Sequence, residues 1–212
     1  MRTLRTPRTL VVGTQALLIE LDSAEQVAAF HAELLRRRDA GDLGPVRDLV
    51  PAARTVLLDG VPDPAALGAR IASWEVPPLT RREGPLVTVA VRFDGPDLSE
   101  VARLWGVAAG EVPGIVAATE FRVAFCGFAP GFGYLTGLPE RLHVPRRDTP
   151  RTAVPAGSLA LAGEYAGVYP RSSPGGWQLI GSTDAVLWDP EREPAALFAP
   201  GVRVRFAQEE RA

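Results

Sequence analysis

The spacing of apolar residues predicts two long helices and several strands in the first half of the chain. Residues 24–39 carry apolar side chains at helical spacing, with Ser23 as the N-cap. A second helix is predicted over 64–74, where Asp63 supplies the cap and Pro64 takes the favoured first position. Strands are expected at residues 10–12, 16–21, 46–50, 54–58 and 86–93.

This order of elements is typical of an α+β domain. A strand, a helix, two strands and a helix, followed by the strand at 86–93, fit a small ferredoxin-like unit. Residues 76–84 are rich in proline and charge, and we interpret them as a linker. The first residues, MRTLRTPRTLVVG, hold too short an apolar run for a secretory signal, so we expect a solvated tail.

The second half has a different pattern. A short helix ending at Trp105 is capped by Asp97 or Ser99, and another is expected over 109–118. From Phe121 onward the chain shows only short apolar runs between turn signals, which is typical of a β-sandwich or barrel. The runs are 122–126, 142–144, 153–157, 159–163, 177–181, 185–189 and 202–206.

Glycine and proline are concentrated between residues 127 and 183. Those 57 residues hold 10 of the 21 glycines and 7 of the 20 prolines. Aromatic side chains are interleaved with them, whereas disordered segments are poor in aromatics. We therefore predict a folded, loop-rich surface here, the kind of surface on which binding and catalytic groups gather.

Composition narrows the chemistry. The formal net charge is −2 and no run approaches the ~20 apolar residues of a membrane helix, so we expect neither nucleic-acid nor membrane partners. All 23 basic residues are arginine, which excludes a Schiff-base lysine and a lysine-containing phosphate loop. One cysteine excludes an internal disulfide and suits the cytoplasm. Two distant histidines make a zinc site improbable.

Two of these scarce residues have structural explanations. Cys126 follows an apolar run, so a buried structural thiol is favoured over a nucleophile. His143 precedes Val144 and Pro145, and a packing or surface role is favoured over that of a general base.

Three arginines between prolines form the strongest candidate for chemistry. Arg146, Arg147 and Arg151 lie in the sequence PRRDTPR, whose prolines restrict the backbone. The functional interpretation, for Arg146 and Arg151 above all, is a catalytic clamp on a carboxylate or phosphate. The alternative is structural pairing with an acidic neighbour such as Asp148, Glu140 or Glu164.

Two further loops supply candidate substrate- or phosphate-binding groups. In SSPGGW the two glycines can present consecutive N–H groups to an anion, or simply form a turn that buries Trp177. In GFAPGFGYL the aromatics can wall a pocket or plug the barrel. The candidates are Tyr169, Ser173, Gly175 and Gly176, together with Gly131, Phe132 and Tyr134.

Two acidic residues flank a turn in FDGPDL. Asp94 and Asp97 could bind a ligand, but a turn and a helix cap account for both.

Several motifs together resemble one family. They are FDGPDL at 93–98, FRVAFCGFAPGFGYLTGLP at 121–139, PRRDTPRTAVPAGSLALAG at 145–163 and GVYPRSSPGGWQLIG at 167–181. With GTQALLIE, LVPAARTVLL, LWDP and PGVRVRF, the resemblance spans nearly the whole chain. On these motifs the chain resembles the family that contains the B subunit of 5-oxoprolinase, allophanate hydrolase subunit 1 and the Kip inhibitor of a histidine kinase, within the carboxyltransferase subdomain C/D superfamily.

The resemblance implies a ferredoxin-like domain over 1–82 and a cyclophilin-like β-barrel over 83–212. It implies a heteromeric enzyme in which this chain works with a homologous C subunit and with an A subunit, converting 5-oxo-L-proline to L-glutamate. It also implies ATP with Mg²⁺, bound by the complex rather than by this chain alone. The alternatives are a Kip-type kinase inhibitor and a component of another amide or urea-type hydrolase.

The chain departs from the family pattern at three places. Val116 lies near a position usually held by histidine, Tyr165 falls where GQTG is common, and Ser182 replaces the arginine of IGRT. These changes are compatible with a different substrate, with reliance on partner residues, or with a divergent subfamily of ordinary activity.

Overall fold

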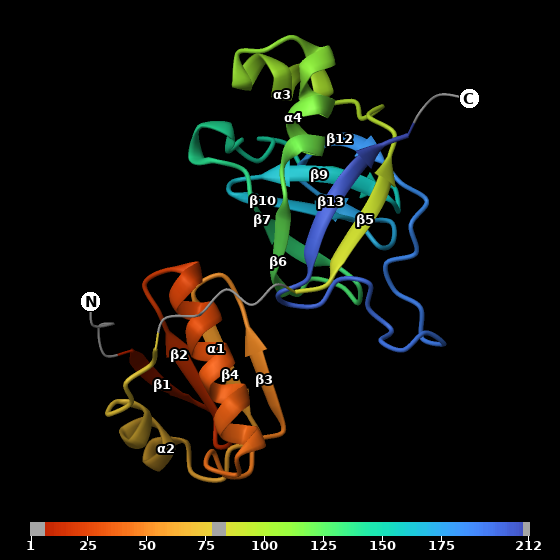
Figure 1. Ribbon diagram of the computed structural model, residues 1–212. Coiled ribbons are helices and arrows are strands. Elements are labelled where there is room, and N and C mark those ends of the chain that lie inside the picture. Colours follow the sequence, from red (N-terminus) through yellow and green to blue (C-terminus); the bar gives the residue numbers. More distant parts are fainter. Residues whose placement is uncertain (1–6, 78–83, 210–212) are drawn as a thin grey trace. The chain divides into compact units, whose positions relative to one another are not determined.

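The computed structural model describes residues 7–77 and 84–209 and divides the chain into two compact units, over residues 1–82 and 83–212 (Figure 1). The expected N-terminal tail lies partly outside the described residues, at 1–6. So does most of the expected linker, at 78–83.

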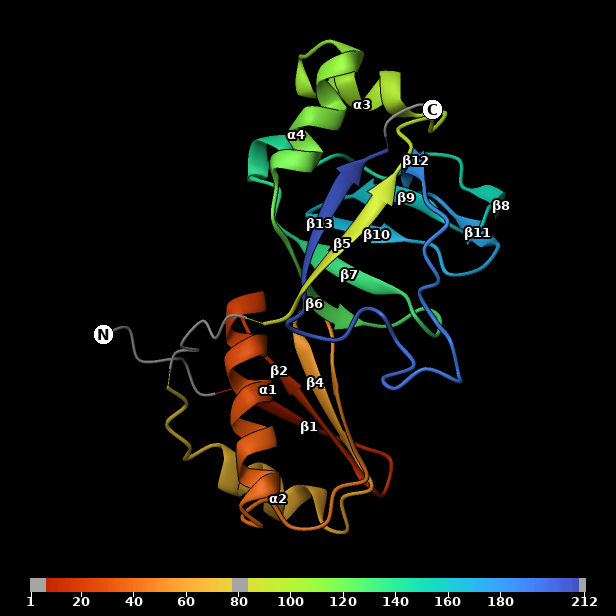
Figure 2. The same cartoon turned by 45° about the vertical axis from the view of Figure 1, so that its right-hand side comes forward.

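Unit 1 is a four-stranded antiparallel sheet with both helices on one face (Figures 1 and 2). Helix α1 lies against β3 and β4, whereas α2 lies against β1 and β2. The strand order is β1-β2-β4-β3. The elements are β1 (Arg8–Val12), β2 (Ala16–Glu20), α1 (Ala24–Asp39), β3 (Asp48–Pro51), β4 (Thr55–Asp59) and α2 (Pro64–Ile71).

The local sequence rules account for these elements. Ser23 caps α1 by accepting a hydrogen bond from the Gln26 N–H, and Asp63 caps α2 through the Ala66 N–H. The helical and alternating periodicities then bring one apolar face of each element into a common core. That core includes Leu17, Ile19, Phe30, Leu34, Val56 and Leu58.

One strand assignment was wrong. The ferredoxin-like element order used the run at 86–93 to complete the first sheet, although the expected domain bounds put it in 83–212; it forms β5 (Leu86–Val91) of unit 2 and pairs in parallel with β13 (Arg203–Gln208). The fourth strand of unit 1 is β1, joined to β2 by a tight turn in which Gly13 has a φ of 59°. Alternation identifies a strand and its buried face but not its partner, and the nearby hairpin costs little loop entropy.

Unit 2 is a seven-stranded, nearly closed sheet in the order β12-β9-β10-β7-β6-β13-β5. An isolated bridge between Arg92 and Ser182 links its two ends, β5 and β12. A two-stranded ribbon of β8 and β11 lies beside it (Figure 2). The remaining strands are β6 (Phe121–Cys126), β7 (Gly133–Thr136), β8 (Arg151–Val154), β9 (Ser158–Ala162), β10 (Tyr165–Val168), β11 (Ser173–Gly175) and β12 (Gln178–Ser182).

Short helical segments cover unit 2. They are α3 (Leu98–Trp105), η1 (Ala109–Glu111), α4 (Val112–Ala118) and η2 (Glu140–Leu142). Val101, Val112 and Val116 bury their side chains in the barrel core. No single helix among the described residues is long and apolar enough to span a membrane; α3 followed by 109–118 reaches that length only as a pair bent by 95°.

Two predicted apolar runs are not regular strands. The run at 142–144 begins with the last residue of η2 and contributes one bridge, Val144 to Gly163. The run at 185–189 contributes only the bridge from Trp188 to Ala196. In the second run, burial of Leu187 between exposed Val186 and Trp188 reproduces the alternation of a strand without forming a ladder.

Candidate functional site

The arginines of PRRDTPR surround a buried carboxylate that none of the expected partners supplies. Arg147 Nη1 and Arg151 Nη2 each donate to Asp97 Oδ1 at 2.8 Å, and the Leu179 N–H donates to Oδ2 at 2.7 Å. The sequence-based partners Asp148, Glu140 and Glu164 were therefore wrong. Asp97 begins α3 but makes no capping hydrogen bond with its side chain.

Burial and neighbouring charges shift the pKa of Asp97 in opposite directions. Asp97 is only 4% exposed. Burial alone would raise the pKa of Asp97, but hydrogen bonds from Arg151 and Leu179 and the charges of both arginines hold it below its usual value. The carboxylate thus stays ionised at neutral pH and fastens the segment 147–151 to α3 and β12. Arg147 Nε and Arg151 Nη1 are buried and make no hydrogen bond within the described ranges.

Arg146 is placed differently from the other two arginines. It is exposed, and it forms no ion pair with any residue of 7–77 or 84–209. Its charge lowers the pKa of the Tyr134 and Tyr169 hydroxyls, although burial, the larger effect, leaves both values raised. Arg146 is thus the arginine of this segment whose guanidinium remains available to an anionic ligand.

The predicted aromatic residues form one cluster, which the adjacent glycines link to Arg146: a Cβ at Gly176 would lie 3.7 Å from Arg146 Nε, and Gly175 packs against the Tyr169 hydroxyl. Phe132 lies at its centre, with ring centroids 5.0 Å from Tyr134, 5.5 Å from Tyr169 and 5.6 Å from Trp177, all edge to face. Phe132 and Tyr169 are buried, whereas Tyr134 is half-buried. The cluster therefore serves packing first, and its two tyrosine hydroxyls give it a polar margin next to Arg146.

The glycines of SSPGGW have a steric reason. A Cβ at Gly175 would collide with the Tyr169 hydroxyl, and the carbonyl of Gly176 accepts the Arg147 N–H at 2.7 Å. Gly175 also pairs with Arg151 across the ribbon of β8 and β11. The glycines thus allow the arginine segment, the ribbon and Tyr169 to approach closely.

The other two loop candidates are less directly involved. Ser173 is buried and its hydroxyl donates to the Arg171 carbonyl at 3.2 Å, which favours a structural role. Gly131 has a φ of 83°, and a Cβ there would lie 2.9 Å from Trp188 Cβ. It lies at a contact between loops rather than beside Arg146.

The less favoured chemical candidates are engaged elsewhere. His143 Nε2 lies 3.1 Å from the Leu138 carbonyl oxygen, and the Cys126 thiol donates to the Phe198 carbonyl at 3.4 Å. Burial raises the pKa of Cys126, which disfavours the nucleophilic thiolate. The Ser182 hydroxyl donates to Asp94 at 2.9 Å.

The other two family departures have structural surroundings. Val116 is fully buried in the barrel core. Tyr165 stacks edge to face with Phe125 and Tyr134.

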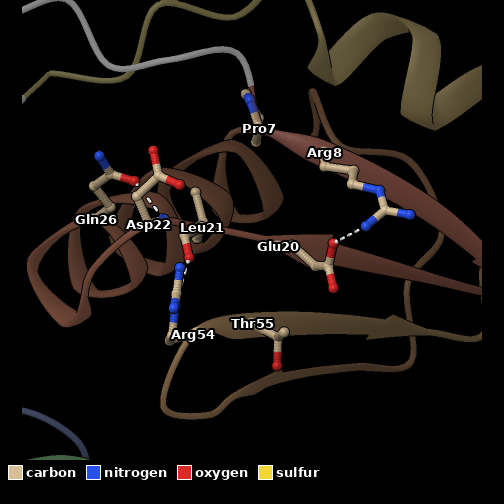
Figure 3. A pocket seen from close by; sticks show the side chains of 8 residues that line it. All are labelled: Pro7, Arg8, Glu20, Leu21, Asp22, Gln26, Arg54 and Thr55. Carbon is tan, nitrogen blue, oxygen red and sulfur yellow. Dashed lines mark hydrogen bonds and ion pairs between the residues drawn. The ribbon is translucent and has the colours of Figure 1, made fainter.

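A surface depression in unit 1 is a weaker candidate (Figure 3). Arg8 pairs with Glu20 at 3.0 Å, Arg54 donates to the Leu21 carbonyl, and Gln26 accepts the Asp22 N–H. Several of its polar groups are thus engaged with one another, and none of the predicted site residues lines it.

The candidate site is therefore the surface around Arg146, Tyr134 and Tyr169 in unit 2. Motif reasoning selected these residues, and the structure brings them together with Phe132, Gly175, Gly176 and Arg151. Motif reasoning did not identify Asp97 as the partner of the arginines, because a role as helix cap already explained an aspartate at this position. A guanidinium beside two phenols can bind a carboxylate or phosphate, but it supplies no general base.

Comparison with known proteins identifies relatives of the whole chain. It is 38% identical over 207 residues to the B subunit of 5-oxoprolinase from Escherichia coli O157:H7, covering 94% of each chain. The protein of the same name from Bacillus subtilis strain 168 is 46% identical over 114 residues, covering 54% of this chain and 48% of that protein.

Solved structures give the same picture. TTHA0988 superposes with a TM-score of 0.76 at 31% identity, covering 93% of this chain but only 40% of that one. PH0987 from Pyrococcus horikoshii, described as a conserved uncharacterized protein, gives 0.57 at 31% identity and covers 96% and 98% of the two chains. The family described as carboxyltransferase domain, subdomain C and D, matches residues 7–198, and the chain belongs to it.

Proposed function

We propose that this chain is the B subunit of an ATP-dependent 5-oxoprolinase. Together with the A and C subunits, it would convert 5-oxo-L-proline to L-glutamate. The observation that carries the proposal is the 38% identity to the B subunit of a 5-oxoprolinase across 94% of both chains. The position of Arg146 beside two tyrosine hydroxyls supports it, because 5-oxoproline carries a carboxylate that a guanidinium can bind.

The chemistry needs activation of a poor electrophile. Transfer of the γ-phosphoryl group of ATP to the lactam oxygen releases ADP and makes the ring carbon electrophilic. Addition of water and cleavage of the C–N bond then give an acyl phosphate, which a second water hydrolyses to glutamate and phosphate. We assign to Arg146 the binding of the substrate carboxylate, with Tyr134 and Tyr169 shaping its surroundings.

Arg151 takes a different part in this proposal. It was expected to be catalytic; because it donates to Asp97, we propose instead that it is a positioning residue that holds the segment of Arg146. Within the described residues, Arg146 is the one guanidinium of this segment left unpaired, and this proposal assigns it to the substrate carboxylate. We therefore propose that ATP, as its magnesium complex, is bound by the assembled complex.

We also infer the finer fold of both units. In unit 1, β1 lies beside β2, in the place that the last strand of a ferredoxin-like sheet would take. We infer that this unit is a ferredoxin-like sheet whose closing strand comes from the N-terminal end of the unit. The nearly closed sheet of unit 2 supports the cyclophilin-like barrel that the family resemblance implies.

The test is 5-oxoproline-dependent ATP hydrolysis and glutamate release. The chain would be assayed alone, with the C subunit, and with both the A and C subunits. We expect turnover only in the complete mixture, and a rise in KM of about 10- to 100-fold for Arg146→Ala, the range for one charged hydrogen-bonding group. Arg141→Ala is the matched control, since Arg141 is an exposed arginine on η2.

Two results would count against this assignment. Absence of turnover in a mixture that still forms a stable complex would exclude 5-oxoproline as the substrate. An unchanged KM for Arg146→Ala in an active complex would remove Arg146 from the binding site.

A further inference from the structure

Two adjoining loops of unit 2 hold large apolar side chains in solvent. Phe128 is 57% exposed, Val186 60% and Trp188 45%, and Pro130 beside Phe128 is also exposed. We propose that this apolar patch (Phe128, Pro130, Val186 and Trp188) is the surface on which the partner C subunit docks. The inference rests on the proposed function for the identity of the partner, and it assigns the surface that this partner covers.

The backbone at Phe128 is strained. Its φ of 68° is the one positive value at a non-glycine residue in the described ranges. An L-residue with a side chain pays roughly 1–2 kcal/mol for this conformation, and glycine would avoid it. One side of the ring packs on Phe132 and Tyr169, but 57% of the residue is in solvent, so burial in this chain accounts for only part of it. Strain of this kind is typical of functional surfaces.

The second loop is ordered although it contains little regular structure. Residues 183–202 connect β12 to β13 and run outside the barrel (Figures 1 and 2). Within it, the Arg192 guanidinium donates to the carbonyl oxygens of Val186 at 3.1 Å and Ala195 at 2.9 Å, and further to Leu187 and Pro194. Leu187 and Phe198 anchor the loop in the core.

The hydrogen bonds of Arg192 and the buried side chains of Leu187 and Phe198 hold the loop so that Val186 and Trp188 face outward. Immobilising side chains costs less on binding when the loop already holds them, so pre-organised aromatic residues make effective interface anchors. Tryptophan is the residue type most enriched at interface hot spots.

The two loops form one surface that continues into the candidate site. Gly131 of the first loop lies so close to Trp188 that a Cβ there would be 2.9 Å from Trp188 Cβ. Phe128 in turn stacks edge to face on Phe132 and Tyr169, with centroids 5.3 Å and 6.0 Å away. A chain that covers Phe128 would therefore lie over the ring that packs on Tyr169, at the edge of the candidate site.

The known relatives indicate the kind of occupant. The superposition with TTHA0988 covers 93% of this chain but only 40% of the TTHA0988 chain. In TTHA0988 a similar module is therefore part of one polypeptide that also contains a larger additional region. The curated relatives are named as the B component of a multi-subunit enzyme. A permanent protein partner fits the chemistry of the patch, because aromatic and aliphatic anchors without charge are typical of the centre of such interfaces.

Affinity between the full chain and the C subunit, measured by biolayer interferometry without substrate or ATP, tests the proposal. We expect Trp188→Ala to weaken binding by about 30-fold or more and Phe128→Ala by about 10-fold, as for interface hot spots. Arg192→Ala should weaken it as well, although it removes no apolar side chain. Leu86→Ala, at a residue 42% exposed on β5, is the matched control and should change little.

Several outcomes would overturn the assignment of this surface to the C subunit. Absence of binding by the unaltered chain would do so, as would equal affinities for all variants or an equal loss for Leu86→Ala. A dimer of this chain that Trp188→Asp dissociates would assign the patch to a second copy instead. A complex that depends on Trp188 but does not turn over 5-oxoproline would keep this surface and refute only the proposed activity.

Discussion

Each unit contains a buried carboxylate that accepts hydrogen bonds from two arginines. The two networks differ in how far apart their members lie in the sequence. Glu33 in α1 is 6% exposed and accepts from Arg36 and Arg37, three and four residues away on the same helix. Asp97 in unit 2 is 4% exposed and accepts from arginines 50 and 54 residues away, and from the N–H of Leu179, 82 residues away.

The difference decides what each network does. The Glu33 network lies on a single helix, whose periodicity already specifies it without these ion pairs. Its Arg37 guanidinium lies 3.9 Å from the centroid of the Trp74 ring. The Asp97 network joins α3, the segment before β8 and the start of β12, and so fixes the backbone from which Arg146 projects. Two similar sets of ion pairs thus have a local role in one unit and a site-building role in the other.

Removal of Asp97 is the change that should separate the two networks most. Asp97→Ala leaves two guanidiniums and one buried N–H without their acceptor. We expect a loss of about 3 kcal/mol in the free energy of unfolding, at the low end for a broken buried pair because both guanidiniums keep some solvent contact. Urea unfolding followed by peptide-resolved hydrogen exchange measures this.

The exchange data also test where the effect falls. Faster exchange should be confined to peptides of unit 2, with those of α1 unchanged. Asp97→Asn, which keeps the shape and one acceptor, should lose less than Asp97→Ala. Equal losses for the two variants would show that the negative charge accounts for the whole effect and that the remaining amide oxygen contributes nothing.

A second prediction separates Arg151 from Arg146 in the same short segment. Arg151→Ala removes one of the three donors to Asp97, and we expect it to lower the free energy of unfolding by about 2 kcal/mol. Arg146→Ala should stay within about 0.5 kcal/mol, as for an exposed side chain without partners. Thermal unfolding of both variants side by side measures the contrast, and a larger loss for Arg146→Ala would reverse the roles assigned here.

The contrast between the networks also explains which features were predictable. The bounds of α1 were predicted correctly at 24–39, because a cap and a helical repeat are local properties. The motifs also selected residues that the structure brings together, such as Phe132, Tyr134 and Tyr169, since glycine and proline at those spacings restrict the backbone strongly.

What could not be predicted depends on distant contacts. Nothing near Asp97 in the sequence identifies arginines 50 residues away as its partners, and its capping position was already a sufficient explanation. The alternation at 86–93 likewise defined a strand without indicating the sheet that it joins. Arg146 and Arg151 have similar local sequences, so only their contacts distinguish the exposed guanidinium of Arg146 from that of Arg151, which donates to Asp97.

A third prediction concerns the local network. Glu33→Ala should lower the free energy of unfolding by about 1 kcal/mol, because Arg36 remains exposed and solvent can replace the carboxylate. The tryptophan fluorescence of Trp74, beside Arg37, should change with it. A loss as large as that for Asp97→Ala would remove the distinction between the two networks.

The smallest expected effect is on acid sensitivity. The hydrogen bond from Arg36 is the main cause that lowers the pKa of Glu33 to about 2, and the pKa of Asp97 is also below its usual value. Because the unfolded chain binds protons first as the pH falls, both carboxylates contribute their full stability above about pH 4. That contribution is lost as the pH falls from there toward the folded pKa, about 2 for Glu33.

Urea unfolding at pH 6, 4 and 3 measures this loss for the unaltered chain, Glu33→Gln and Asp97→Asn. Each variant should lose less stability on acidification than the unaltered chain, by up to about 1 kcal/mol, since it has one depressed carboxylate fewer. The Glu33→Gln difference should appear in peptides of unit 1 and the Asp97→Asn difference in those of unit 2. Parallel pH profiles for all three proteins would mean that neither carboxylate has a lower pKa in the folded chain than in the unfolded one.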